Sequence, residues 1–136
     1  MRRVLVDSGG FFALLVREDQ FHDRARSLFG QANSENWRLM TTNVVVIESY
    51  ALLLTRAHGG RHHAIRFLDM VSRDAYQVER ISQSDEENAM RLVRAHQDKA
   101  YSLCDALSFV VMERIGIEEA IAFDRHFHEY GRFRIL

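Results

Sequence analysis

Short runs of apolar residues alternate along the chain with longer segments in which apolar residues recur every three or four positions. The short runs are typical of buried strands, and the longer segments have the periodicity of helices. This alternation predicts an α/β protein built of strand–helix units around a parallel sheet. The candidate strands are residues 3–6, 38–41, 76–81, 120–123 and 132–136.

Polar residues mark the starts of several predicted helices. A serine, threonine or asparagine before an apolar helical segment is typical of a helix N-cap, and an acidic residue three positions later completes a capping box. The candidate caps are Thr42 or Asn43, Ser84 with Glu87, and Ser102 with Asp105 in a weaker form. Gly59-Gly60 should end the helix that starts at Thr42 or Asn43.

The helix expected from Thr42 or Asn43 to about Ala57 is apolar on all sides, which predicts that it is largely buried. Glu48 lies within it and is therefore hard to place in water. A buried unpaired carboxylate is costly, so its partner should be a metal ion or an arginine of an internal salt bridge. In the next helix, over residues 61–73, we expect Ile65, Phe67 and Leu68 to face inward.

Composition narrows the class of protein. The 136 residues fit one domain over 1–136, because no proline and no Ser/Gly-rich linker marks a boundary. One cysteine, Cys104, excludes an internal disulfide, and the start lacks the features of a signal peptide. No apolar run is long enough for a membrane span, so we expect a cytoplasmic protein. The net charge of −1 argues against binding that depends only on nonspecific phosphate contacts.

Four acidic residues occupy positions that solvated surface residues rarely take: Asp7, Glu48, Asp105 and Asp124. Taken singly, each has a simpler explanation as a turn residue, a helix cap or a salt-bridge partner. Asp7 and Asp124, however, follow predicted strands, whereas Glu48 and Asp105 lie early in helices. Ligands of open parallel sheets bind beyond the carboxyl ends of strands, where the strand order reverses. The four carboxylates should therefore converge on one pocket.

Four carboxylates in one pocket repel one another unless a cation lies among them. Oxygen ligands alone favour a hard ion such as Mg²⁺ or Mn²⁺. Two such ions can activate a water molecule and stabilise the leaving oxygen of a phosphodiester. The set thus indicates phosphodiester hydrolysis, with Asp7, Glu48, Asp105 and Asp124 as catalytic and metal-binding candidates.

The same residues lie in segments that resemble those of a known family. The chain is similar over nearly its whole length to PIN domains, and more narrowly to the toxin nucleases of the VapC type. The resemblance rests on Val4-Leu5-Val6-Asp7-Ser8, His22-Asp23-Arg24-Ala25, Thr41-Thr42-Asn43-Val44 with Glu48, residues 98–106 with Asp105, and Phe123-Asp124-Arg125-His126-Phe127 with Gly131. The last two segments, with their order and spacing, are the most specific.

This resemblance implies a PIN-like three-layer α/β/α fold with a five-stranded parallel sheet. It also implies a Mg²⁺- or Mn²⁺-dependent endoribonuclease, a cognate antitoxin, frequent homodimers, and metal roles for the four acids. Asp98 and Ser8 are candidates for supporting positions around the metal. Cys104 stands where a threonine is frequent, which puts a hydroxyl contact there in doubt.

Other readings of the sequence lead to different chemistry. His126 and His128 could share a transition metal, but no third histidine or cysteine has suitable spacing. A nucleophilic Cys104 would need a base, and none is evident. A receiver-like domain would need a lysine late in the chain, whereas the only lysine here is Lys99. A catalytically inactive PIN-like module that binds RNA or protein should have lost one of the acids, and none is missing.

Surface contacts are harder to assign. The arginines that we expect to contact RNA are Arg91, Arg94, Arg125, Arg132 and Arg134, although arginines of this kind commonly pair with acids on solvated faces. For a homodimer, the candidate faces are the apolar segments 11–15 and 62–68.

Overall fold

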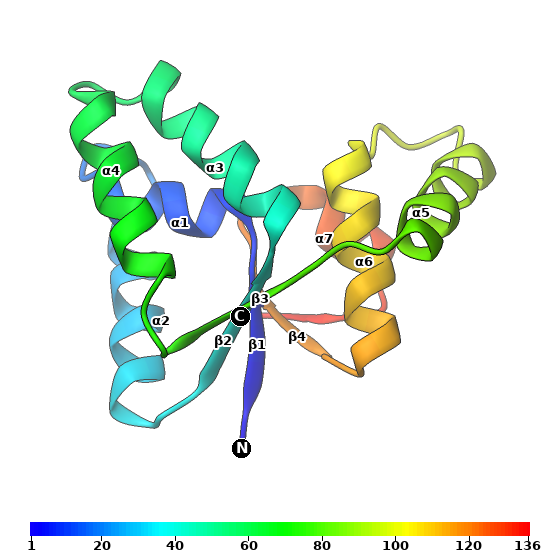
Figure 1. The fold of residues 1–136 in the computed structure, drawn as a ribbon, viewed down its shortest axis with the longest axis horizontal. Helices are drawn as coiled ribbons and strands as arrows, with labels where there is room; N and C mark the ends of the chain where they lie inside the picture. The colour runs from blue at the N-terminus through cyan, green and yellow to red at the C-terminus, as the bar shows by residue number, and fades with distance from the viewer.

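A computed structural model describes all of residues 1–136, with five strands and seven helices (Figure 1). In chain order these are β1 (Arg3–Val6), α1 (Ser8–Leu15), α2 (His22–Ser34), β2 (Arg38–Thr42), α3 (Asn43–Arg56), α4 (Gly60–Val71), β3 (Tyr76–Glu79), α5 (Gln83–Ala95), α6 (Leu103–Ile115), β4 (Glu119–Ile121), α7 (Arg125–Tyr130) and β5 (Arg134–Ile135). None of the helices has both the length and the apolar composition that crossing a membrane requires.

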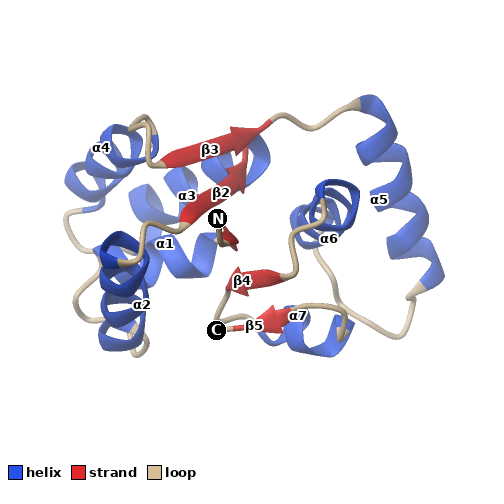
Figure 2. Cartoon of the chain, turned by 90° about the horizontal axis from the view of Figure 1, so that it is seen from below, coloured by secondary structure: helices blue, strands red, loops and turns tan.

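All five strands are parallel and lie in the order β3-β2-β1-β4-β5. Helices α1 to α4 lie on one side of this sheet, and α5 to α7 lie on the other (Figures 1 and 2). The expected three-layer α/β/α fold with a five-stranded parallel sheet is therefore confirmed. From β1 the chain first builds outward through β2 and β3 and then returns to place β4 on the other edge of β1. The order thus reverses between β1 and β4.

Strand β1 contributes to the core on both faces of the sheet, as its continuous apolar sequence predicts. Val4 and Val6 pack in the larger core cluster with Phe11 and Phe67, beneath the first group of helices. Leu5 points the other way and packs in a second cluster with residues of α6 and α7. Successive side chains of a strand alternate between faces, so a fully apolar strand is the signature of a sheet that is covered on both sides.

Helix α1 lies unusually close to the point where the strand order reverses. A Cβ atom on Gly10 would lie 3.0 Å from the backbone oxygen of Ile121 and 3.1 Å from a methyl of Val6. Only a residue without a side chain fits there without displacing β4 or β1. Gly10 therefore fixes α1, and the turn that precedes it, directly over the ends of these two strands.

Several predicted boundaries differ from the structure. The third strand ends at Glu79 rather than Ile81, because the Ile81 amide donates to the Asn43 side chain instead of continuing the sheet (3.0 Å). The fourth and fifth strands are also shorter than predicted. The capping box predicted at Ser84 and Glu87 is wrong. The box is formed two residues earlier, by Ser82 and Asp85, whereas the box of Ser102 and Asp105 is confirmed.

The prediction that α3 is buried on all sides is also wrong. Val45 and Leu53 face the core, but the side chain of Ile47 is 68% exposed and that of Leu54 is exposed as well. On α4 Phe67 is buried as expected, whereas Ile65 is exposed rather than inward-facing. The two helices pack against each other at the outside of their layer, so each presents one apolar face to solvent.

Candidate active site

Asp7 lies at the carboxyl end of β1, where the strand order reverses. Its backbone amide donates to the oxygen of Ile121 on β4 (3.1 Å), and its own carbonyl accepts from the amides of Gly10 and Phe11 in α1. The residue is the N-cap of α1, yet its side chain makes no capping hydrogen bond. Only 3% of Asp7 is exposed, and its Oδ1 atom is buried without a hydrogen-bond partner. Buried polar atoms without a partner are uncommon, and this one is placed to act as a ligand.

The surroundings of Asp7 disfavour its charge. Burial raises the pKa of its carboxyl to about 8, and the nearby negative charge of Asp105 acts in the same direction. The backbone amide of Ser8 opposes this effect, while Glu48 and Asp124 add to it. The four acids predicted to share a pocket therefore lie close enough to repel one another. A bound divalent cation would remove that repulsion.

Asp105 is held by local hydrogen bonds at the start of α6. Its amide donates to the Ser102 hydroxyl (3.0 Å), and its Oδ2 accepts from the Ser102 amide (3.1 Å). The same oxygen lies 2.8 Å from Nδ1 of His126. Asp105 is buried. The same residue thus closes the capping box and belongs to the group of acids. The capping box fixes the direction in which this carboxylate points.

Asp124 is the N-cap of the short helix α7, three residues after β4 ends. Its Oδ1 accepts from the backbone amide of His126 (2.7 Å) and lies 3.2 Å from Nδ1 of the same residue. Because carboxylates only accept hydrogen bonds, the His126 ring donates from Nδ1 and ties Asp105 to Asp124. Donor atoms of these three residues lie within 4.8 Å of one another. The sequence analysis considered His126 only as a transition-metal ligand, not as a link between two acids.

Glu48 lies on the second turn of α3 and is half-buried. The Cys104 thiol, at the start of α6, lies near enough to the Glu48 carboxylate for that acid to raise the pKa of the thiol. Burial raises the pKa of that thiol, and the charges of Glu48, Asp7 and Asp105 raise it further. The thiol is therefore protonated at neutral pH, which argues against the alternative of a nucleophilic Cys104.

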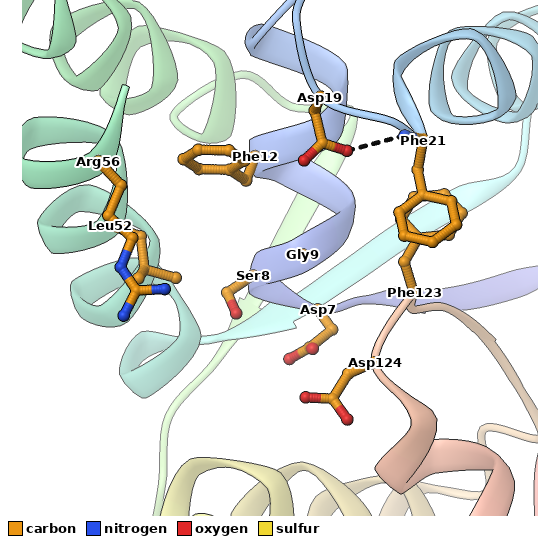
Figure 3. Close-up of a pocket in the computed structure, with 10 residues that line it drawn as sticks. All are labelled: Asp7, Ser8, Gly9, Phe12, Asp19, Phe21, Leu52, Arg56, Phe123 and Asp124. Atoms are coloured by element: carbon orange, nitrogen blue, oxygen red, sulfur yellow. Dashed lines mark hydrogen bonds between the residues drawn. The ribbon is translucent and has the colours of Figure 1, made fainter. Parts of the chain in front are cut away.

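The two supporting candidates take different positions. Ser8 is buried next to Asp7 and lines the same cavity (Figure 3). The Asp98 side chain is 77% exposed after α5 and lies 3.9 Å from Lys99, outside the group of acids. His128 is also exposed and does not join His126, so the structure does not bring together the alternative pair of histidine ligands.

A cavity of about 330 Å³ opens beside the acids, at the ends of β1 and β4. Figure 3 shows the carboxylates of Asp7 and Asp124 side by side at its base, with Arg56 on the opposite wall. Sequence analysis missed Arg56. It lies eight residues after Glu48, and hence on the same face of α3, which was a signal that could have revealed it.

Most of the arginines proposed from the sequence are engaged elsewhere. Arg125 pairs with Glu129 (3.5 Å), Arg132 with Glu113 (3.2 Å) and Arg134 with Glu119 (4.0 Å). Arg91 donates to the side chain of Asn88 (2.7 Å). The structure thus favours the simpler interpretation of these residues, that of ion pairs and polar contacts on a solvated face. Arg94 takes part in none of the ion pairs.

The donors gathered here fit a hard divalent cation. Asp7, Glu48, Asp105 and Asp124 offer only oxygen atoms, and one Asp7 oxygen has no partner within the protein and is free to bind a cation. Mg²⁺ and Mn²⁺ prefer such ligands.

A parallel sheet between helices, with acids where the strand order reverses, is typical of α/β proteins that bind a divalent cation. Comparison with known proteins identifies the family. Residues 4–133 match the PIN domain. The chain is 32% identical over 128 residues to VapC20, a 23S rRNA-specific endonuclease of Mycobacterium tuberculosis, with 94% of each chain covered, in both strain CDC 1551 and strain H37Rv. The crystal structure of M. tuberculosis VapC20, described as a sarcin-ricin loop cleaving toxin, superposes with a TM-score of 0.86 at 30% identity, covering 95% of each chain.

The chain therefore belongs to the PIN-domain family and, within it, to the VapC-type ribonucleases. This confirms the resemblance that the sequence motifs indicated.

Proposed function

We propose that this protein is a Mg²⁺- or Mn²⁺-dependent endoribonuclease, and that it is the toxin of a toxin–antitoxin pair. Asp7, Glu48, Asp105 and Asp124 form its catalytic and metal-binding site. The observation that carries this proposal is the buried Asp7 carboxylate, which has one oxygen without a partner and three other acids around it. Such a carboxylate is costly to a protein that gains nothing from a cation.

The contacts around each acid indicate what it would contribute to metal binding. The divalent ion, when bound, would supply a Lewis acid that lowers the pKa of water and neutralises charge on the phosphodiester. Asp105 and Asp124 are held in place by the Ser102 cap and by His126, so their oxygens need little reorganisation to bind it. The backbone hydrogen bonds of Asp7 to β4 and α1 hold its carboxylate at the end of β1, where it would bind the ion from the buried side.

For the substrate, we propose RNA, with 23S rRNA as the first candidate to test. The support is the similarity to VapC20, whose name states specificity for 23S rRNA. The chain covers nearly all of that relative, and the relative covers nearly all of the chain. For the location we propose the cytoplasm, where ribosomal RNA is found.

The metal requirement is tested with the purified protein and a mixture of ribosomal and synthetic RNA. We expect cleavage in Mg²⁺ or Mn²⁺, loss of cleavage in EDTA, and recovery when either ion is added in excess, because the ligands are hard oxygens. Undiminished cleavage in EDTA would exclude the proposed mechanism. Recovery with Zn²⁺ alone would favour a site that includes His126. RNA binding without cleavage in either ion would favour the catalytically inactive module.

We also propose a homodimer, formed through apolar faces of the first group of helices. The predicted segment 11–15 is mostly covered, because Phe11 and Ala13 are buried, whereas Ile65 in segment 62–68 is exposed. Ile47 and Leu54 of α3 add exposed apolar area beyond these segments. Sedimentation at tens of micromolar should give twice the chain mass of 15.9 kDa, and a monomer would contradict the proposal.

A further inference from the structure

Two phenylalanine rings stack at the edge of the cavity, next to the acids. The rings of Phe21 and Phe123 lie 4.8 Å apart between centroids, with an angle of 6° between their planes. Figure 3 shows the two rings overlapping on the side of the cavity opposite Arg56. Phe21 is 37% exposed, so part of its ring is open to solvent beside the cavity.

The position of this aromatic pair relative to the acids is fixed by the chain. Phe123 directly precedes Asp124, so a single short segment delivers a ring to the cavity and a carboxylate to the acidic site. The turn that carries Phe21 is held by Asp19, whose Oδ2 accepts from the Phe21 amide (2.9 Å). The rings therefore lie at a set distance from the place where the scissile phosphate would be bound.

The remaining walls of the cavity complete the chemistry of a binding site. Phe12 adds a third aromatic side chain, and the carboxylate of Asp19 faces the same space. Arg56 lies on the opposite wall, is exposed, and takes part in none of the ion pairs of the structure. The apolar ring faces, the Asp19 carboxylate and the Arg56 guanidinium match a nucleobase, which has two apolar faces and a polar edge, and its adjoining phosphate.

We propose that this cavity holds one unpaired base of the RNA, stacked on the Phe21–Phe123 pair, next to the phosphodiester that is cleaved. The proposal rests on the proposed nuclease function and adds a reason for its selectivity. A base that is already unpaired, in a loop or a single strand, enters without breaking a duplex. Arg56 neutralises a phosphate beside the cavity, a local contact that does not depend on the net charge of the chain, which is −1.

The test is a cycle of enzyme variants against RNAs that lack one base at a time. Four proteins are compared: the parent, Phe21→Leu, Phe21→Trp, and the control Met90→Ala, which removes an exposed apolar side chain on α5, far from the cavity. Leucine keeps the apolar volume but removes the ring face, and tryptophan keeps the face. Melting temperatures of all four verify that they fold.

With the parent and Met90→Ala, one abasic position beside the cleavage site should lower kcat/KM roughly tenfold, the size expected for one stacked base. For Phe21→Leu, kcat/KM on the intact RNA should already be roughly tenfold lower than for the parent. Removing the base beside the cleavage site should then lower it little further. Phe21→Trp should behave as the parent does. Equal losses in the parent and Phe21→Leu at every abasic position would overturn the proposal.

Two further outcomes separate the alternatives. If the parent cleaves no RNA, the proposed function fails, but the same cycle measured as RNA binding by fluorescence anisotropy still tests the base site. Equal affinities of the parent and Phe21→Leu for the intact RNA would then overturn it. If Phe21→Leu cleaves like the parent yet escapes an inhibitory protein encoded beside it, the cavity is a protein-docking site and the proposal is wrong.

Discussion

At the scale of single residues, the site depends on side chains whose positions are fixed by a few short contacts. Asp105 has two roles, since it closes a capping box and presents an oxygen to the acidic pocket. His126 links it to Asp124 and thereby sets the distance between two carboxylates that belong to different elements. The capping box of Asp105 and its place among the acids were predicted from the sequence, whereas the contact with His126 was not, because the two residues lie 21 positions apart in the chain.

The link through His126 should matter for catalysis more than for folding. His126→Ala removes the ring that donates to Asp105 and lies 3.2 Å from Asp124, and we expect kcat/KM to fall about 10- to 100-fold, as for other residues that orient metal ligands. His126→Asn, whose amide can replace the Nδ1 donor, should recover part of the loss. The matched control is His128→Ala on the exposed side of the same helix. A His126→Ala protein that cleaves RNA at the parent rate would show that the acids hold their positions without it.

At the scale of elements, caps and apolar periodicity predicted most of the helices, but not where two competing signals lie close together. Ser84 with Glu87 and Ser82 with Asp85 both have the spacing of a capping box. The second pair forms it because Asp85 also binds the Arg114 guanidinium of α6, at 2.8 and 2.9 Å. This tertiary contact decides between the two boxes, and no local pattern contains it. Similarly, the apolar sequence of α3 could not reveal that one of its faces stays exposed.

The Asp85–Arg114 contact should make the packing of α5 on α6 depend on pH. Burial raises the pKa of the Asp85 carboxyl, but hydrogen bonds from Arg114 and Ser82 outweigh this effect, so the pKa lies below its ordinary value. The ion pair therefore stabilises the fold above the unfolded-state pKa of about 4, and the stabilisation is lost as pH falls through the folded-state pKa.

Accordingly, Asp85→Asn should lower the free energy of unfolding by about 1.5–3 kcal/mol at pH 7, the range for hydrogen bonds to charged groups. The difference from the parent should shrink as pH falls below about 4 and should be lost once pH has fallen through the lower folded-state pKa, where Asp85 is protonated in the folded protein too. Urea unfolding at several pH values measures it, with the exposed neighbour Glu86→Gln as control. An equal difference at pH 3 and pH 7 would mean that the charge is not the cause.

At the scale of the whole molecule, the fold brings together acids that are far apart in sequence. The parallel sheet and the placing of Asp7 and Asp124 after strands were predictable, whereas the strand order, with its reversal between β1 and β4, came only from the structure. The cavity walls were not predictable either, because Phe21 and Arg56 belong to a turn and a helix end whose positions follow from tertiary packing. The result is a concentrated negative pocket in a protein that is almost neutral overall.

Such a pocket should also attract cations other than metals, which suggests how an antitoxin could inhibit the protein. An arginine from a partner's tail could pair bidentately with two carboxylates and compete with the metal. We expect the protein encoded beside this chain to bind more weakly as salt rises, and to bind Asp124→Asn more weakly than the parent. A titration by calorimetry measures both effects. Equal binding to both proteins at all salt concentrations would place inhibition outside this pocket.

The central claim is that Asp7 and the other three carboxylates together bind the metal ion that RNA cleavage needs. Its most direct test is cleavage by Asp7→Asn in Mg²⁺. We predict that cleavage is nearly abolished, while Asp98→Asn, which neutralises an exposed acid, cleaves as the parent does. Because the metal-free folded parent must either bury a repelled charge or take up a proton at Asp7, whose pKa is raised to about 8, metal-free Asp7→Asn should also be more stable than the metal-free parent, by roughly 1–3 kcal/mol. An Asp7→Asn protein that cleaves RNA at the parent rate in Mg²⁺ would contradict the account.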